Sequence, residues 1–190
     1  MTMMTGNNHD PNQTDSIGRK YLRYLDRCLI ALEAEDNRIE ALLLSMRTAK
    51  NIHVYGFGRS GTAALAFAIR LRHFSADLPP VWWIGDQVRE PIREEDLVIL
   101  FTQSGTRKEV VLIAQMAKKA RATIALVTAE KDSEMANLAT LTIVAPRLDE
   151  AFVYGGGDFE LASWYLQEVL VSLLGTCLKI PLGEVDRPHL

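Results

Sequence analysis

Hydrophobic positions near the start of the chain recur at helical spacing. From Ile17 to Leu32 they return every three or four residues, which predicts a helix that Asp15 or Ser16 would cap. The same spacing predicts a second helix from about Asp36 to Thr48. Residues 1–15 are mostly small and polar, so we expect them to form a flexible tail.

The pattern changes after residue 50 into short runs rich in Val, Ile, Leu and aromatic residues, which alternate with helical stretches. The runs expected to form strands are 51–55, 81–84, 97–101, 123–127 and 141–144. The helical stretches after them are 62–74, 108–120, 133–138 and 158–178. Apolar strands that alternate with helices indicate a parallel sheet covered on both faces. We therefore expect an α/β fold, a three-layer α/β/α sandwich with a five-stranded parallel sheet and extra N-terminal helices, as one domain over residues 16–190.

Composition narrows the class of protein without naming a function. The 190 residues suit a single domain, and 21 basic against 24 acidic residues give a net charge of −3. This weak negative charge predicts no overall attraction to nucleic acid or to an anionic membrane. No apolar run approaches the roughly 20 residues of a membrane helix, and the polar start is unlike a signal peptide. We expect a cytoplasmic protein in which Cys28 and Cys177 are reduced thiols of the core.

The first candidate for chemistry is a glycine-rich loop after the first strand. Gly56 to Gly61 reads GFGRSG and fits the G-x-G-x-x-G pattern, which admits dinucleotide binding with Asp86 as the partner of a ribose. Asp86 follows Gly56 by thirty residues, further than the usual spacing of about 20. The alternative is a tight turn between strand and helix that simply needs glycine.

A second loop, Thr102-Gln103-Ser104-Gly105-Thr106, lies between the third strand and a helix. Its hydroxyls and the helix N-terminus offer hydrogen bonds and a positive dipole end to a phosphate, although Ser104 or Thr106 would use the same atoms to cap the helix. Ligands of open parallel sheets bind at the carboxyl ends of the strands. Two such loops facing one crevice favour a small phosphorylated metabolite over a dinucleotide.

GFGRSG and TQSGTRKEV together resemble the phosphosugar-binding loops of the sugar isomerase (SIS) domain family, which have the forms G-x-G-x-S and S-x-S-G-E-T. The resemblance extends over residues 16–189 and implies a flavodoxin-like sheet. Within the family the chain is most similar to the 6-phospho-3-hexuloisomerases, through AFAIRLRHF at 66–74, the Phe159-Glu160-Leu161 step and a histidine near the C-terminus. Those enzymes interconvert 3-hexulose 6-phosphate and fructose 6-phosphate in the ribulose monophosphate pathway.

The resemblance implies roles for individual residues. Glu160 matches the general base of the family, and His189 matches its C-terminal histidine, which can enter the site of a neighbouring subunit. The residues implied in binding the substrate and its phosphate are Gly58, Arg59, Ser60, Thr102, Gln103, Ser104, Thr106 and Arg107. Without the resemblance, Glu160 fits a carboxylate that interacts with a helix dipole, and His189 fits a penultimate residue with no role.

The chain departs from the S-G-E-T pattern of the family. Thr106 takes the position of the acidic residue and Arg107 that of the hydroxyl. An arginine can bind a phosphate through two parallel hydrogen bonds, so phosphate binding is expected to survive with altered geometry.

These observations lead to one expected function and three alternatives. We expect a phosphosugar isomerase that works through an enediol and needs no metal or redox cofactor. A non-catalytic sugar-phosphate-binding module, a phosphoheptose-type isomerase and, more remotely, a nicotinamide dehydrogenase stay open. The N-terminal helices and the last helix are apolar enough that we also expect a homo-oligomer, either a dimer or a tetramer.

Overall fold

The apolar runs after residue 50 form one parallel sheet with the strand order β2-β1-β3-β4-β5 in the computed structural model, which describes residues 11–148 and 157–181. The strands are β1 (Ile52–Gly56), β2 (Val81–Trp83), β3 (Leu97–Phe101), β4 (Thr123–Thr128) and β5 (Leu141–Val144). The helices are α1 (Pro11–Glu33), α2 (Asp36–Thr48), α3 (Arg59–Arg72), α4 (Lys108–Ala120), α5 (Glu134–Leu138) and α6 (Asp158–Cys177). This strand order is the flavodoxin-like one.

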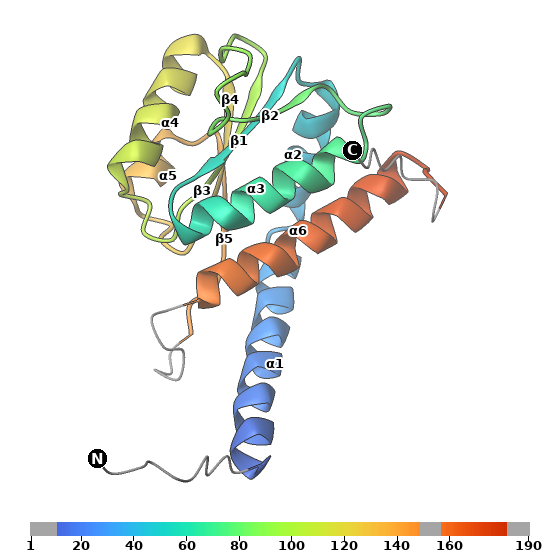
Figure 1. Ribbon diagram of the computed structural model, residues 1–190, viewed down its shortest axis with the longest axis vertical. Coiled ribbons are helices and arrows are strands. Elements are labelled where there is room, and N and C mark those ends of the chain that lie inside the picture. Colours follow the sequence, from blue (N-terminus) through green and yellow to red (C-terminus); the bar gives the residue numbers. More distant parts are fainter. Residues whose placement is uncertain (1–10, 149–156, 182–190) are drawn as a thin grey trace, which may run out of the picture.

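The helices form two layers with the sheet between them (Figure 1). Helices α2, α3 and α6 cover one face, and α4 and α5 cover the other. The chain moves from β1 to β2 in one direction along the sheet and from β3 to β4 in the other. Because crossovers between parallel strands are almost always right-handed, α3 and α4 lie on opposite faces. The predicted three-layer fold with a five-stranded parallel sheet is confirmed.

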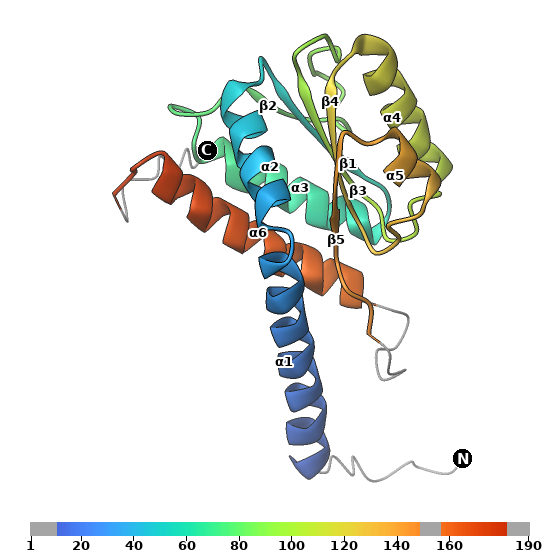
Figure 2. The ribbon, with the colours of Figure 1, turned by 180° about the vertical axis from the view of Figure 1, so that it is seen from behind.

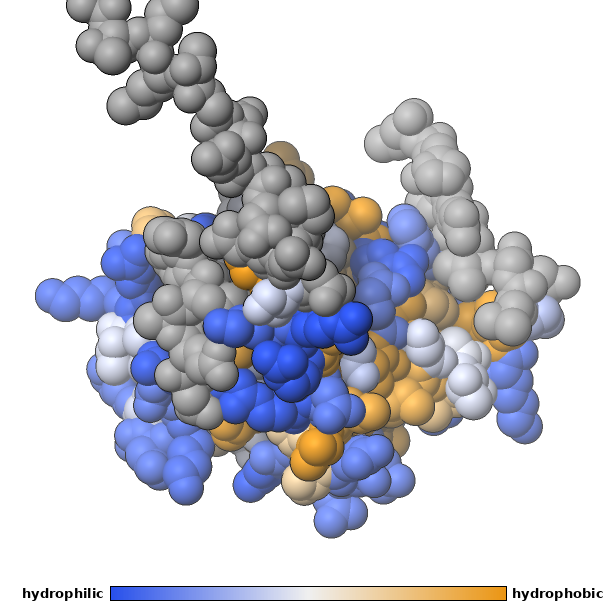
Figure 3. All heavy atoms as spheres, turned by 90° about the horizontal axis from the view of Figure 1, so that it is seen from below, coloured by the Kyte–Doolittle hydropathy of each residue, from blue (hydrophilic) through white to orange (hydrophobic). Residues whose placement is uncertain are grey.

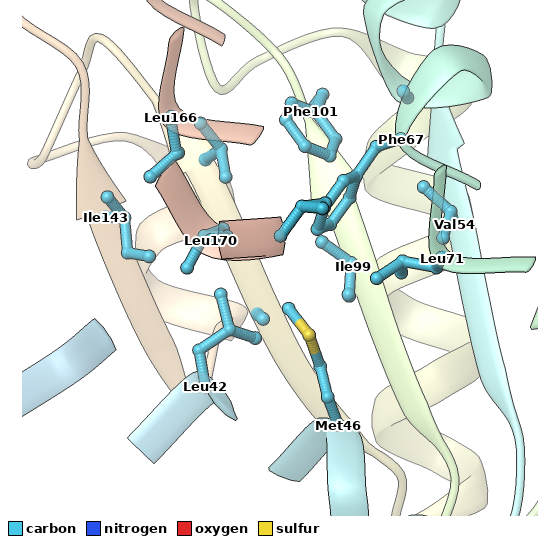
Figure 4. Close-up of a cluster of buried hydrophobic side chains, with 14 of the residues drawn as sticks. Leu42, Met46, Val54, Phe67, Leu71, Ile99, Phe101, Ile143, Leu166 and Leu170 are labelled. Atoms are coloured by element: carbon cyan, nitrogen blue, oxygen red, sulfur yellow. The ribbon is translucent and has the colours of Figure 1, made fainter. Parts of the chain in front are cut away.

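Two apolar clusters, one on each face of the sheet, explain why the strands contain so few polar residues. Leu97, Ile99 and Phe101 of β3 belong to the larger cluster beneath α2, α3 and α6, which Figure 4 shows in close-up. Val98 and Leu100, which point the other way, belong to the cluster beneath α4 and α5. All five side chains are fully buried. A strand inside a three-layer sandwich must be apolar on both sides.

Helix α1 extends away from the sheet and packs against α6 (Figure 2). The hydroxyl of Tyr24 lies 2.8 Å from the carbonyl oxygens of both Pro146 and Asp158, within hydrogen-bond distance of each. Asp158 is the first residue of α6, so this contact ties the start of α6 to α1. The predicted cap at Asp15 or Ser16 is wrong, because the helix begins at Pro11, whose fixed backbone torsion suits a first helical turn.

Two further expectations need correction. Helix α3 begins at Arg59 instead of Thr62, because its N-cap is Gly58, which has no capping side chain to mark the boundary in the sequence. Cys28 is buried as expected, but Cys177 is exposed and is not a core thiol. In the part of the chain that the structure describes, every helix is too short or too polar to cross a membrane.

A buried polar network fixes the amino-terminal edge of the sheet. The Asp96 carboxylate accepts hydrogen bonds from the Asn51 side chain at 2.9 Å and from the Arg93 backbone N–H at 2.7 Å. His53 Nε2 lies 3.1 Å from Asp96 Oδ2, and both side chains are fully buried. Burial lowers the pKa of His53 below its ordinary value, and nearby Arg89 adds to this, whereas the charges of Asp96 and Glu90 oppose it.

The depressed pKa of His53 predicts a stability that depends on pH. The unfolded chain takes up a proton on this imidazole below about pH 6.5, whereas the folded chain resists doing so. The free energy of unfolding should therefore fall as the pH drops from 7.5 to 5.5, with a slope from this group of up to about 1.4 kcal/mol per pH unit. Urea unfolding of the wild type and of His53→Gln measures this slope. An equal slope in both proteins would contradict the assignment.

Candidate functional site

A cavity of ≈ 520 Å³ opens at the carboxyl ends of β1 and β3. Here the chain leaves one strand toward α3 and the neighbouring strand toward α4, on the opposite face of the sheet. The two departing loops therefore separate and leave a crevice, the usual ligand site of open α/β sheets. The volume lies within the range of about 300–1,000 Å³ that is typical of small-molecule sites.

The glycine-rich loop forms one wall of this cavity through a close approach of strand and helix. A Cβ atom on Gly56 would lie 2.7 Å from the backbone oxygen of Ser60, and one on Gly61 would lie 2.8 Å from that of Gly56. The two glycines therefore let β1 and α3 approach more closely than side chains would allow. This geometry places Gly58, Arg59 and Ser60 on the cavity wall.

The second loop, residues 102–107, forms the opposite wall and is held from behind by β4 and α5. Backbone N–H groups of Ala129 and Met135 donate to the carbonyl oxygens of Gln103 and Gly105, both at 3.1 Å. The buried Thr128 hydroxyl donates to the Gln103 carbonyl oxygen at 3.2 Å. These bonds occupy carbonyl oxygens of the loop, and Thr102, Gln103, Ser104, Thr106 and Arg107 line the cavity.

Two helices present uncapped N-termini to the cavity. The N-cap residues of α3 and α4 are Gly58 and Arg107, and neither makes a side-chain capping bond. Ser104 accepts hydrogen bonds from the N–H and the hydroxyl of Thr106, at 3.4 and 3.1 Å, so neither residue caps α4. The capping alternative for these hydroxyls is thus wrong. The N–H groups of the first helical turns and the two positive helix dipole ends favour an anion in this cavity.

Glu160, in the first turn of α6, is the most buried charged side chain in the cavity wall. Its Oε1 accepts a hydrogen bond from Ser60 Oγ at 3.2 Å, and its Oε2 lies 3.7 Å from Arg59 Nε. Oε2 is itself buried and accepts no hydrogen bond from any described residue. Because a buried carboxylate oxygen without a hydrogen bond is costly, Oε2 is the atom of this site that a bound molecule would best complete.

Arg107 reaches across the crevice to the first loop. Its guanidinium carbon lies 4.8 Å from the centre of the Phe57 ring, a cation–π distance, and its Nε lies 3.8 Å from Glu109 Oε2. Phe57, Lys108 and Glu109 also line the cavity and were not among the residues predicted from the sequence. Phe57 lies between Gly56 and Gly58 of the first loop, and Lys108 and Glu109 directly follow the second loop. Their positions next to the two loops were therefore the signal in the sequence that could have predicted them as lining residues.

The structure brings together all eight predicted binding residues and Glu160 around one cavity. His189 lies outside the described residues, so its role stays a prediction. Asp86, the expected partner of a ribose, does not line this cavity; it lies 3.9 Å from Arg72 in an exposed ion pair. That placement removes the acidic group on which the dinucleotide interpretation of the first loop depended.

No group of three or more His, Cys, Asp or Glu side chains is arranged to hold a metal ion in residues 11–148 and 157–181. The cavity itself carries the basic residues Arg59, Arg107 and Lys108 beside the acidic residues Glu109 and Glu160. Viewed from below, the surface shows hydrophilic side chains across its middle and hydrophobic ones in separate patches (Figure 3).

Comparison with known proteins identifies a family and a recurring activity among relatives. The model of the SIS domain family matches residues 45–166. A 3-hexulose-6-phosphate isomerase from Mycobacterium gastri is 34% identical over 166 residues, which cover 84% of this chain and 82% of the relative. The chain spans about half the length of matching archaeal relatives from Aeropyrum pernix, Archaeoglobus fulgidus and Methanothermobacter thermautotrophicus (46%, 51% and 59%).

Solved structures share the fold at low sequence identity. A crystal structure of a hypothetical protein from Methanococcus jannaschii, for which a molecular function of 3-hexulose-6-phosphate isomerase is inferred, aligns with a TM-score of 0.80. It is 22% identical, and the alignment covers 90% of this chain and 98% of the other. The NanR protein of Vibrio vulnificus, complexed with ManNAc-6P, aligns with a TM-score of 0.69 at 20% identity, over 90% of this chain and 64% of NanR.

The geometry of the second loop predicts a strong effect of a single added methyl group. Gly105 has a φ of 62°, and a Cβ atom on it would lie 2.0 Å from Ser133 Oγ. The left-handed conformation costs other residues about 1–2 kcal/mol, so Gly105→Ala should lower the melting temperature by about 2–8 °C. It should also weaken binding of inorganic phosphate severalfold, as measured by calorimetry, because the loop must shift.

The matched control is Gly18→Ala. A Cβ atom on Gly18 in helix α1 would meet nothing within 4 Å, so this variant should keep phosphate affinity and melt at the same or a higher temperature. Unchanged phosphate affinity in Gly105→Ala would contradict the placement of the loop in the site.

Proposed function

Because the chain belongs to the SIS domain family, we propose that it is a phosphosugar isomerase that interconverts 3-hexulose 6-phosphate and fructose 6-phosphate. The observation that carries the proposal is Glu160 Oε2, which is buried and accepts no hydrogen bond from the described residues, in a cavity whose opposite wall is a hydroxyl-rich loop. The similarity to a relative named 3-hexulose-6-phosphate isomerase over 84% of the chain supports this choice of substrate.

The phosphate of the sugar would bind against the second loop. Ser104 and Thr106 offer hydroxyls, the first turn of α4 offers N–H groups, and Arg107 and Lys108 supply positive charge. The acidic position of the family pattern holds Thr106 in this chain, which removes a negative charge from the phosphate site. A guanidinium can donate two parallel hydrogen bonds to phosphate oxygens, which compensates for the hydroxyl that Arg107 replaces.

The reaction would take place beside Glu160, on the wall formed by α3 and α6. The carboxylate removes the proton from carbon 2 of 3-hexulose 6-phosphate, next to the carbonyl at carbon 3, and an enediol forms. Return of the proton to carbon 3, with transfer of a hydroxyl proton between the two oxygens, gives the ketone at carbon 2. These steps are proton transfers only, so the proposal requires no metal or redox cofactor.

Neighbours of Glu160 suit these steps. The hydrogen bond from Ser60 holds one carboxylate oxygen in place and leaves the other for the substrate. Arg59 Nε, 3.7 Å from that second oxygen, is near enough to donate to an enediolate oxygen as negative charge develops on it. We propose His189, through its match to the family, as the group that moves protons between the oxygens.

Replacement of Glu160 by glutamine tests the proposal directly. The amide keeps the size of the side chain but cannot accept the proton, so turnover of 3-hexulose 6-phosphate should fall by about 10²–10⁴-fold. Fructose 6-phosphate production is followed in a coupled assay, and affinity for fructose 6-phosphate is measured by calorimetry. Affinity should stay within a few-fold of the wild type.

Glu168→Gln is the control variant on the same helix. Glu168 pairs with Arg70 at 2.8 Å outside the cavity, so its turnover should match that of the wild type. Wild-type protein that binds fructose 6-phosphate without turning over the hexulose phosphate would contradict the proposed reaction. That result would favour a binding module or an isomerase of another phosphosugar, such as a phosphoheptose.

We also propose that the protein is a homo-oligomer, a dimer or a tetramer. Helix α1 projects from the rest of the chain with Leu22 67% and Ile30 58% exposed. Ile69 of α3 and Trp164 of α6 are 50% and 47% exposed on the face opposite α4. Groups of exposed large apolar side chains are typical of surfaces that another protein covers.

Light scattering coupled to size-exclusion chromatography at micromolar concentration measures the mass of the assembly. A dimer or tetramer is expected, and Ile69→Glu should shift it toward monomer because a charge would be buried. Met116→Glu is the control, since Met116 is 47% exposed on α4, on the other face of the sheet. A wild-type monomer would overturn this proposal.

A further inference from the structure

A cation–π contact between Phe57 and Arg107 joins the two loops of the cavity. Phe57 is 41% exposed at the tip of the first loop, although a large aromatic side chain would normally be buried. The Arg107 guanidinium from the second loop lies over its ring, 4.8 Å from the centre. Both residues line the cavity, so this contact joins its α3 side to its α4 side.

The cation–π contact with Phe57 does not use the N–H groups of the guanidinium as hydrogen-bond donors to an oxygen. A guanidinium that lies over an aromatic ring uses its flat face, whereas its N–H groups point outward in the plane. Glu109 lies near one edge, with its Oε2 3.8 Å from Arg107 Nε. The Arg107 side chain makes no hydrogen bond within the part of the chain that the structure describes.

Binding of a ligand by Arg107 carries an entropic cost, which the contact with Phe57 reduces. The Arg107 side chain is 57% exposed, and a long exposed side chain loses rotamer freedom when it is ordered on a ligand. An aromatic ring that already holds the guanidinium lowers this loss. The same ring also ties the two walls together, since Phe57 and Arg107 are fifty residues apart in the sequence.

We propose that Phe57 is a positioning residue, which holds the Arg107 guanidinium over the cavity so that its N–H groups bind the phosphate of the ligand. The inference rests on the proposed function, because it takes the ligand to be a phosphate monoester. Phe57 then acts through Arg107 and does not itself contact the reacting carbons. It contributes to affinity for the phosphate group and leaves the proton-transfer steps unchanged.

A double-mutant cycle tests the coupling of the two side chains. Calorimetry gives the affinity for inorganic phosphate and for fructose 6-phosphate in the wild type, Phe57→Leu, Arg107→Met and the double variant. Phe57→Leu should weaken binding by two- to fivefold, equivalent to the roughly 0.5–1 kcal/mol of an exposed cation–π contact. In the Arg107→Met background the same substitution should have no effect, because no guanidinium remains to be positioned.

Two variants separate positioning from a general effect on folding. Phe57→Tyr keeps the aromatic face and should restore wild-type affinity. Leu112→Ala removes an apolar side chain that is 56% exposed on α4 outside the cavity, and it should leave affinity unchanged. In turnover assays Phe57→Leu should raise KM by the same two- to fivefold with kcat unchanged, as expected when only binding is lost.

The outcomes distinguish this inference from the proposed function. Equal weakening by Phe57→Leu in both backgrounds, or no weakening in either, overturns the positioning role even if the wild type isomerises the hexulose phosphate. Phosphate binding with the expected coupling supports the role even if no hexulose phosphate is turned over. A wild type that binds neither phosphate nor the sugar phosphate overturns both.

Discussion

The reversal of direction between β1 and β3 is the constraint on which the site depends. Neighbouring parallel strands send α3 and α4 to opposite faces, so the loops that follow them part above the edge of the sheet. This separation places the two loops, and the N-termini of α3 and α4, around one cavity. Helix α6 then closes the α3 side and carries Glu160 into the gap, with its start tied to α1 through Tyr24.

The two walls of the cavity differ in their electrostatic character. The wall formed by the second loop has hydroxyls, the N–H groups at the start of α4 and the positive charges of Arg107 and Lys108, with Glu109 beside Arg107. The other wall holds the buried carboxylate of Glu160 with one oxygen satisfied by Ser60 and the other without a hydrogen bond among described residues. An anion and a carboxylate repel each other, so opposite walls suit a molecule whose phosphate lies several bonds away from its reacting carbons.

Local patterns in the sequence were sufficient to predict the sheet and most of the cavity. Continuous apolar runs such as Leu97–Phe101 predict buried parallel strands, and glycine-rich loops that directly follow strands predict where ligands bind. Contacts between distant residues left no such pattern. The pairing of His53 with Asp96 spans 43 residues and that of Phe57 with Arg107 spans fifty, and nothing local marks either partner. The early start of α3 was missed for a related reason, because Gly58 has no side chain to signal a cap.

The contact between Gly105 and Ser133 also restricts how this site can change during evolution. The space that a side chain at position 105 would need is filled by the Ser133 hydroxyl, which also accepts a hydrogen bond from Ala136 N–H as the N-cap of α5. A side chain at position 105 therefore requires a different residue at position 133, as well as a left-handed backbone that residues other than glycine rarely adopt. The two positions are expected to covary among related sequences, although only one of them belongs to the loop that faces the ligand.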